Sequence, residues 1–282
     1  MTWTTITRRE HDRSDLRFAS DMRDVEWALI EPLLPPPSRR GRPRIWPMRA
    51  IWEALLFVLS SGCQWRSLPR EFAPFTTVQH HFYKWRDSGL LETINAELCV
   101  FSRLLVGRAP APAAAVIDSH SVRTTEAGGP RGFDCAKRVK GRKRHIVTDT
   151  GGRLLQAHIT PANVQDVHAA VPLLKTVAAA FPTTRYLFAD RVYRGEQLAR
   201  ALADPDPAAV PWFVDIVTRI EKTGGFVPER KRWVIERTFA WFGRNRRLAK
   251  DFEAKAETQR AWLMLASIKL LNRKAARTLA IT

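Results

Sequence analysis

Two aspartates follow apolar runs in the second half of the sequence, a placement typical of ligand sites. Asp118 follows the run at 114–117 and Asp190 follows the run at 185–189, so each is expected to end a buried strand. In open α/β sheets, ligands bind beyond the carboxyl ends of the strands. The pattern therefore predicts that the two carboxylates lie side by side, although each aspartate could instead cap the turn that follows it.

A third carboxylate is expected on a helix at 232–247. Ile235 and Phe242 mark the buried face of this helix, and the small side chain of Ala240 would let it approach the sheet closely. Glu236 lies about 100° around the helix from Ile235, from where it would point at the strand ends. The alternative is that Glu236 forms a salt bridge with one of the arginines around it.

Three converging carboxylates need a cation, because like charges at short range cannot all stay ionised without one. The hard ions Mg²⁺ and Mn²⁺ prefer carboxylate oxygens and keep positions open for water and phosphate. Two such ions can stabilise both the attacking and the leaving oxygen of a phosphoryl displacement. We therefore predict that Asp118, Asp190 and Glu236 bind two Mg²⁺ or Mn²⁺ ions and act in the cleavage or exchange of phosphodiester bonds.

Two basic segments flank these acids, at 131–145 and 229–250. Their excess of Lys and Arg predicts contacts with nucleic-acid phosphates, although such runs can also serve only to keep a surface solvated. Trp241 lies between Arg237 and Arg244 on one helical face, so its ring could hold an unstacked base; the alternative is a core position. The other cations assigned to these phosphate contacts are Lys140, Arg142, Lys143 and Arg144.

The second half of the chain alternates predicted strands and helices. Their order, βββαβαβα, is that of a ribonuclease H-like mixed sheet within an α/β fold. The strands are expected at 114–118, 145–149, 153–159, 185–189 and 210–217, and the helices at 163–181, 195–203 and 232–247, with a last helix at 258–277.

The first half is expected to be all-α, because apolar residues recur at helical spacing and the joints are short, as in a helix-turn-helix. The helices are predicted at 24–34, 51–59, 76–86 and 88–107. One face of the third helix carries side chains suited to base edges and phosphates, namely Gln79, His80, Tyr83 and Arg86. An exposed face without a partner is the alternative.

A basic run at 39–44 joins the first two of these helices. Arg42 and Arg44 would lie along phosphates or in a minor groove, or they would belong to a solvated linker. We divide the chain into a loose N-terminal arm (1–23), a helical DNA-binding domain (24–110), a catalytic domain (111–253) and a C-terminal helix (254–282).

Composition supports a globular protein with a polyanionic partner. The 282 residues are 45% hydrophobic and 26% charged, which excludes a disordered, collagen-like or disulfide-scaffold chain. Lys and Arg number 46 against 28 Asp and Glu, and the net charge of +18 favours nucleic acid. No apolar stretch approaches about 18 residues, so we expect a cytoplasmic, nucleoid-associated protein with no membrane partner.

Six segments, in order, resemble bacterial insertion-sequence transposases of the IS5 group, which belong to the DDE class. The segments are 24–35, 62–69, 117–122, 141–145, 188–195 and 232–253. The resemblance implies that Asp118, Asp190 and Glu236 are the metal-binding triad of a domain that cuts element ends and joins them to target DNA. It also implies double-stranded DNA as the partner and a homodimer in the synaptic complex. One departure is Val192, which replaces a glycine usual in the second motif.

Two other functions remain compatible with these residues. In a non-catalytic helix-turn-helix regulator, the helical domain would bind DNA and the acids would be structural. In a ribonuclease H-like nuclease, the acids would cleave without strand transfer. Metal-dependent nicking separates a transposase from the regulator, and joining of the cut 3′ end separates it from the nuclease.

Overall fold

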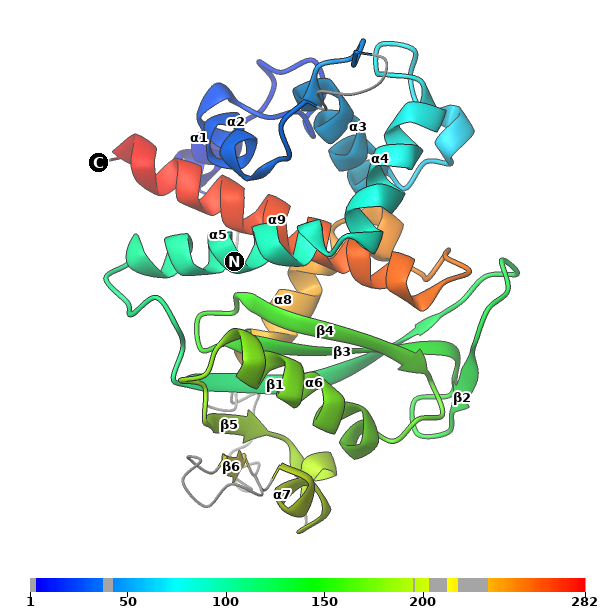
Figure 1. Cartoon of the computed structure of the whole chain (residues 1–282), viewed down its shortest axis with the longest axis vertical. Coiled ribbons are helices and arrows are strands. Elements are labelled where there is room, and N and C mark those ends of the chain that lie inside the picture. The colour runs from blue at the N-terminus through cyan, green and yellow to red at the C-terminus, as the bar shows by residue number, and fades with distance from the viewer. Residues whose placement is uncertain (1–3, 38–42, 195, 203–211, 218–232, 282) are drawn as a thin grey trace.

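The computed structural model describes residues 4–37, 43–194, 196–202, 212–217 and 233–281. The fold is mixed α/β. A twisted mixed sheet forms one part, and the helices of the first half of the chain form the other (Figure 1). The long helix α9 (Ala256–Ile281) runs between the two parts and contacts both.

The sheet combines antiparallel and parallel pairings. Within the described residues the strand order is β2-β3-β1-β5-β6, and β4 also pairs with β3. Strand β1 is antiparallel to β3 and parallel to β5, and β6 continues the parallel part. The strands are β1 (Ala114–Arg123), β2 (Gly132–Asp134), β3 (Val139–Asp149), β4 (Leu154–Pro161), β5 (Tyr186–Ala189) and β6 (Phe213–Ile216).

Strands β1 and β3 are longer than predicted. Pairing of β1 with β3 continues to Arg123, whereas its pairing with β5 ends at Val116, opposite Phe188. Asp118 therefore does not end β1, as we had expected, but lies where β1 leaves β5. A Cβ atom on Gly141 would lie 2.0 Å from the Val122 carbonyl oxygen, so the close approach of the two strands here requires glycine.

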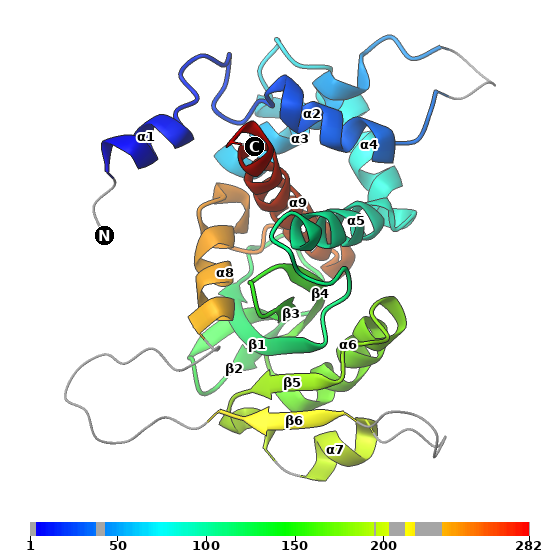
Figure 2. The ribbon, with the colours of Figure 1, turned by 90° about the vertical axis from the view of Figure 1, so that its left-hand side faces the viewer.

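The two faces of the sheet are covered by different helices. Helix α6 (Asp166–Ala180) packs on the face that includes Ile117. Helix α8 (Trp233–Gly243), together with α5 (Leu90–Leu104) and α9, covers the face that includes Val116. Figure 2 shows α8 alongside the sheet, on the side of it away from α6.

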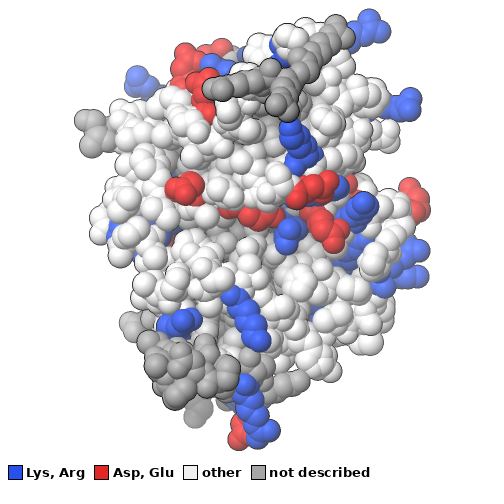
Figure 3. Space-filling model, in the orientation of Figure 1, with Lys and Arg blue, Asp and Glu red and all other residues white. Residues whose placement is uncertain are grey.

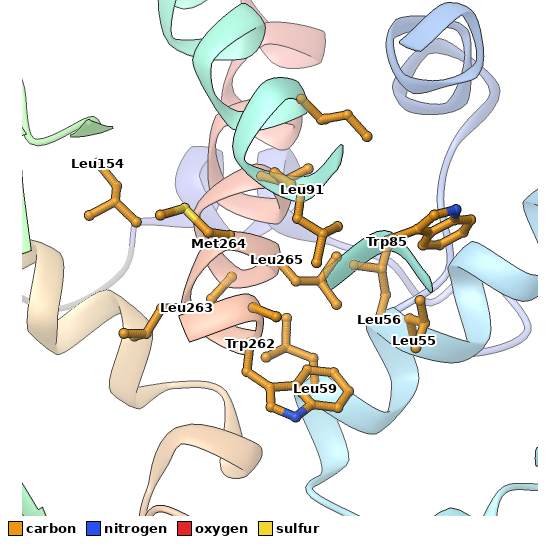
Figure 4. Packing of buried hydrophobic residues seen from close by; sticks show 14 of the residues in the cluster. Leu55, Leu56, Leu59, Trp85, Leu91, Leu154, Trp262, Leu263, Met264 and Leu265 are labelled. Carbon is orange, nitrogen blue, oxygen red and sulfur yellow. The ribbon is translucent and has the colours of Figure 1, made fainter. Parts of the chain in front are cut away.

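The helical half and the sheet share one apolar core. Helix α9 packs against α2 (Asp24–Ile30), α3 (Met48–Ser61), α4 (Phe75–Asp87) and α5. The same cluster includes Leu154 of β4, and Trp262 of α9 lies close to the helices of the first half (Figure 4). Buried residues on the two sides of the boundary that we predicted near residue 110 therefore pack against one another.

Four segments differ from the sequence-based predictions. The N-terminal arm contains α1 (Thr5–His11), and Arg13 ties it to Glu26 of α2 through an ion pair of 2.7 Å. Strand β2 was not predicted. Helix α7 (Glu196–Leu202) agrees with the prediction, whereas α6 begins after its predicted start and α9 extends beyond both predicted ends.

A buried network of ion pairs and hydrogen bonds joins β3 to the segment before α9. Arg142 is 1% exposed, donates to Asp251 Oδ2 at 3.0 Å and also binds the backbone carbonyls of Glu253 (2.8 Å) and Ala254 (2.6 Å). The Glu253 carboxylate in turn accepts from Arg247 and from Trp262 Nε1. Each buried charge is thereby paired, which is the condition for tolerating it in the interior.

None of the described helices is long and apolar enough to cross a membrane.

Candidate active site

The two predicted aspartates face the same side of the sheet. Side chains alternate between the faces of a strand, so Asp118 shares a face with Val116, and Asp190 shares a face with Phe188. Val116 and Phe188 are opposite each other in the parallel register. Continuing that register by two residues places the two aspartates opposite each other, on the face that α8 covers.

Tyr193 provides a second indication that these acids lie close together. Tyr193 is buried and is the last residue of the short 3-10 helix η3 (Arg191–Tyr193). Burial raises the pKa of Tyr193 well above its ordinary value, and the negative charges of Asp166, Asp118 and Asp190 raise it further. Both aspartates are therefore near one hydroxyl. Asp166, at the start of α6, is an acid near this site that we did not predict.

The predicted turn-capping role is also present. Asp190 Oδ1 accepts a hydrogen bond from the Val192 backbone N–H at 2.9 Å and so caps η3. Asp118 Oδ1 accepts one from the Ser119 N–H at 2.7 Å. One oxygen of each carboxylate is thus oriented by the backbone, which limits how the side chain can turn.

Glu236 lies on the side of α8 that faces the continuation of β1. The opposite side of α8 packs on the β3–β4 turn, where Thr238 donates to the Gly152 carbonyl at 3.0 Å. Phe239, one turn after Glu236, lies 5.3 Å from the His120 ring of β1. His120 and Asp118 share a face of the strand, so Glu236 is exposed above the part of the sheet that carries the aspartates.

The donor types fit a hard divalent cation, since carboxylate oxygens from neighbouring strands are the ligands such ions prefer. Among the described residues, however, no three His, Cys, Asp or Glu side chains lie close enough to hold one metal ion. The predicted cluster of three carboxylates is therefore not preassembled, and Glu236 would need to approach the aspartates for all three to share a metal.

Arg237 and Trp241, which we predicted to share one face of α8, contact each other. The Arg237 guanidinium lies 4.4 Å from the centre of the Trp233 ring and 4.5 Å from that of Trp241, and it donates to the Gly151 carbonyl at 3.1 Å. Trp241 is half-buried and Arg244 is exposed. Arg237 is thus engaged within the protein, while Arg244 and part of Trp241 remain accessible.

The basic segment at 131–145 does not form the continuous phosphate track that we predicted. Arg142 is held in the buried network, and Arg144 is 3% exposed and donates to the Leu248 carbonyl at 2.8 Å. Lys143 is buried and pairs with Asp166 at 3.3 Å. Their positive charges are used inside the molecule, so of the four predicted cations only Lys140 is exposed.

Lys140 lines an open pocket on the extension of β1 and β3, with a volume of about 460 Å³. Arg123, Arg131 and Arg138 also line it, together with Phe133, which is 50% exposed. This group keeps the combination of cations and an aromatic ring that favours nucleic acid. On the face shown in Figure 3, Lys and Arg gather at the right-hand side of the middle and stand apart elsewhere, and acidic side chains cross the middle.

The predicted recognition face of α4 is only partly available. Gln79 donates to the Tyr83 hydroxyl at 3.1 Å, and Arg86 lies over the Tyr83 ring at 4.6 Å. Arg86 donates to Asp87 and to Thr258 of α9, so it connects α4 to α9. His80 is exposed, and so is Lys84 one turn later, which we did not predict although it shares the helical spacing of His80.

Arg44 lies near this face, whereas Arg42 is outside the described residues. Burial, together with the charges of His80, Arg44 and Lys84, lowers the pKa of His81 to about 4. Arg44 and Lys84 are both exposed. The exposed positive charge near α4 therefore comes from Arg44, which we predicted to contact DNA, and from Lys84, which we did not.

Comparisons with known proteins identify the class of this protein. The sequence profile of the transposase DDE domain matches residues 110–271, more than half of the chain. A second profile, described as a putative transposase of the IS4/5 family, matches residues 22–95. The chain belongs to the DDE transposase family, and within it to the IS4/IS5 type, which confirms the resemblance found in the sequence.

Curated relatives come from insertion elements. The putative transposase for insertion sequence element IS402 of Burkholderia cepacia is 35% identical over 144 residues, which are 49% of this chain and 64% of that protein. The uncharacterized 16.2 kDa protein of insertion element IS402 from the same organism is 36% identical over 115 residues, 37% of this chain and 74% of that protein. The chain thus spans less than two thirds of the length of the IS402 transposase. No solved structure matches it.

Membership in the DDE family implies DNA binding and a general dependence on divalent metal ions.

Proposed function

We propose that this protein is a transposase that binds the terminal inverted repeats of an insertion sequence, cleaves the DNA at the element ends and joins the freed 3′ ends to target DNA. The observation that carries the proposal is the parallel register of β1 and β5, which ends at Val116 opposite Phe188, two residues before Asp118 and Asp190, on the face that α8 covers. Together with the match to the DDE domain, this arrangement supports a ribonuclease H-like catalytic sheet, to which β2 is a short addition.

Asp118, Asp190 and Glu236 are the residues that would hold two Mg²⁺ or Mn²⁺ ions. When bound, such ions lower the pKa of an attacking hydroxyl and stabilise the leaving 3′ oxygen. The backbone N–H groups of Ser119 and Val192 orient the two aspartates. Glu236 is exposed, so a bound DNA strand could reach it. Two copies of the chain would hold the two element ends together.

The test uses the full chain, Mg²⁺ or Mn²⁺, and a plasmid that carries the two ends of the element. We expect nicks at those ends, no nicks in EDTA, and subsequent joining of the cut 3′ ends to a second duplex. Binding without nicking would replace the proposal by a DNA-binding regulator. Nicking without joining would replace it by a nuclease.

We expect Lys84→Ala to weaken DNA binding equally for all sequences. Removal of one phosphate contact should lower the slope of log K against log salt concentration by about 0.9. Lys175→Ala, which removes an exposed lysine from α6 on the other side of the sheet, is the control and should leave the slope unchanged. Equal slopes for all three proteins, measured by fluorescence anisotropy, would remove α4 from the DNA interface.

We expect Trp241→Ala to lower the cleavage rate about 5-fold to 150-fold, because stacking of one base contributes about 1 to 3 kcal/mol. A substrate whose terminal bases are already unpaired should recover part of this loss. Trp233→Ala is the matched control, since both rings contact Arg237. A large fall in melting temperature for Trp241→Ala, without recovery on the unpaired substrate, would show instead that Trp241 is a core residue.

A further inference from the structure

A pocket of about 490 Å³ lies between the β3–β4 turn, the C-terminal end of α8 and α9. Trp241, Phe242 and Leu271 form part of its apolar wall. Arg244 and Lys274 are exposed, so they can be reached from the surface. The cationic residues of the lining are Arg153, Arg244, Lys269, Arg273, Lys274 and Arg277.

No Asp or Glu is found among the described residues that line this pocket. Lys269 donates to Ser60 Oγ (2.6 Å) and Asn245 Oδ1 (2.9 Å), and Arg273 donates to the Ala19 carbonyl (3.0 Å). These partners are neutral, whereas the carboxylate of Glu26 lies near both cations and offsets part of their positive charge. Arg153 differs, because it pairs with the buried carboxylate of Asp149.

The crowding of cations is unfavourable unless an anion offsets it. Burial, together with the charge of Arg273, lowers the pKa of Lys269 to about 7. Burial also lowers the pKa of Lys274, with a further contribution from Arg153. Like charges held at short range in a partly enclosed space repel one another more strongly than in water. A bound anion with several oxygens would convert this repulsion into attraction.

The pocket is separate from the acidic residues. Trp241 is five residues after Glu236, which corresponds to about 140° around the helix. An anion in the pocket would therefore lie on a different side of α8 from the cleaved bond, while remaining on the helix that carries Glu236.

We propose that this pocket binds a backbone phosphate of the DNA, contacted by Arg244 and Lys274, at a position away from the bond that is cleaved. The inference rests on the proposed function, because it takes its anion from the DNA substrate. The exposed position of both side chains lets the backbone of a duplex reach them, and a phosphate on Arg244 would be bound through two parallel hydrogen bonds. Lys269, Arg273 and Arg277 also raise the local potential.

The first arm of the test measures DNA binding by the full chain with Arg244→Gln and Lys274→Gln combined. Both side chains contact the same phosphate, so the double variant loses one phosphate contact and its salt slope should fall by about 0.9. The control combines Lys175→Gln and Arg200→Gln, which remove two exposed charges from α6 and α7 and should leave the slope unchanged. A double variant that binds and nicks DNA with an unchanged slope would overturn the pocket and leave the transposase proposal intact.

The second arm needs no DNA, so it separates the pocket from the proposed function. Pyrophosphate should raise the melting temperature of the unmodified protein and of the control, because a ligand of the folded state stabilises it, and not that of the double variant. An equal rise in all three would place the anion elsewhere and overturn the proposal. Loss of the rise without a change in the DNA salt slope would show a site for free phosphate and overturn the assignment to DNA. Failure of the unmodified protein to bind DNA would refute the proposed function and, with it, the DNA phosphate as the ligand.

Discussion

Asp118→Asn and Asp190→Asn are each expected to lower the rate of metal-dependent DNA cleavage by about 10³-fold or more. Loss of a charged ligand removes several kcal/mol of transition-state stabilisation by the metal, and about 4 kcal/mol corresponds to this factor. Asparagine keeps the shape of the side chain and an oxygen that can accept the N–H of Ser119 or Val192. The melting temperature and the DNA affinity should therefore change little, and single-turnover cleavage is the measurement.

Asp215→Asn is the matched control for these variants. Asp215 lies on β6, next to β5, and its carboxylate accepts from the Tyr186 hydroxyl at 3.0 Å. Its cleavage rate should stay within about 2-fold of the unmodified protein, a difference of less than about 0.5 kcal/mol. Near-normal cleavage by either aspartate variant would remove that residue from the site.

Glu236→Gln tests the third carboxylate separately, because the described arrangement does not assemble it with the other two. A loss similar to that of the aspartate variants would mean that Glu236 joins them when metal and DNA bind. An unchanged rate would leave a site of two aspartates and contradict the triad.

Arg142→Ala is expected to lower the free energy of unfolding by about 3 to 5 kcal/mol. The substitution would leave Asp251 buried without its ion-pair partner, and breaking one half of a buried pair has a cost of this size. It would also leave the carbonyls of Glu253 and Ala254 without the donors that join them to β3. Urea unfolding followed by tryptophan fluorescence gives the measurement.

Lys140→Ala is the control for Arg142→Ala, since Lys140 lies two residues earlier on the same strand and is exposed. We expect the free energy of unfolding of the Lys140→Ala variant to stay within about 0.5 kcal/mol of that of the unmodified protein. The DNA salt slope of this variant should fall by about 0.9. Equal stability of the two variants would contradict the buried network. A lower salt slope for a folded Arg142 variant would return Arg142 to the DNA interface.

Much of the sheet could be predicted from local patterns. The apolar runs that stop at Asp118 and Asp190 mark where two neighbouring strands separate. The buried part of a strand must be apolar, whereas the residues at its end can be polar. Helical spacing likewise placed Glu236 and Trp241 on different sides of one helix. The predicted end of β1 was wrong, because continued pairing with β3 extends the strand beyond the apolar run.

The sequence by itself determined the class of protein, the positions of the acids along the chain and the excess of positive charge, since these depend on residue type and local spacing. Only the tertiary structure decided which cations are available to DNA. Arg142 and Asp251 are 109 residues apart, and Arg86 and Thr258 are 172 apart, so no local pattern could show that these arginines are engaged. A basic run looks the same whether its charges face solvent or buried partners, and the partners are brought to it only when the chain folds.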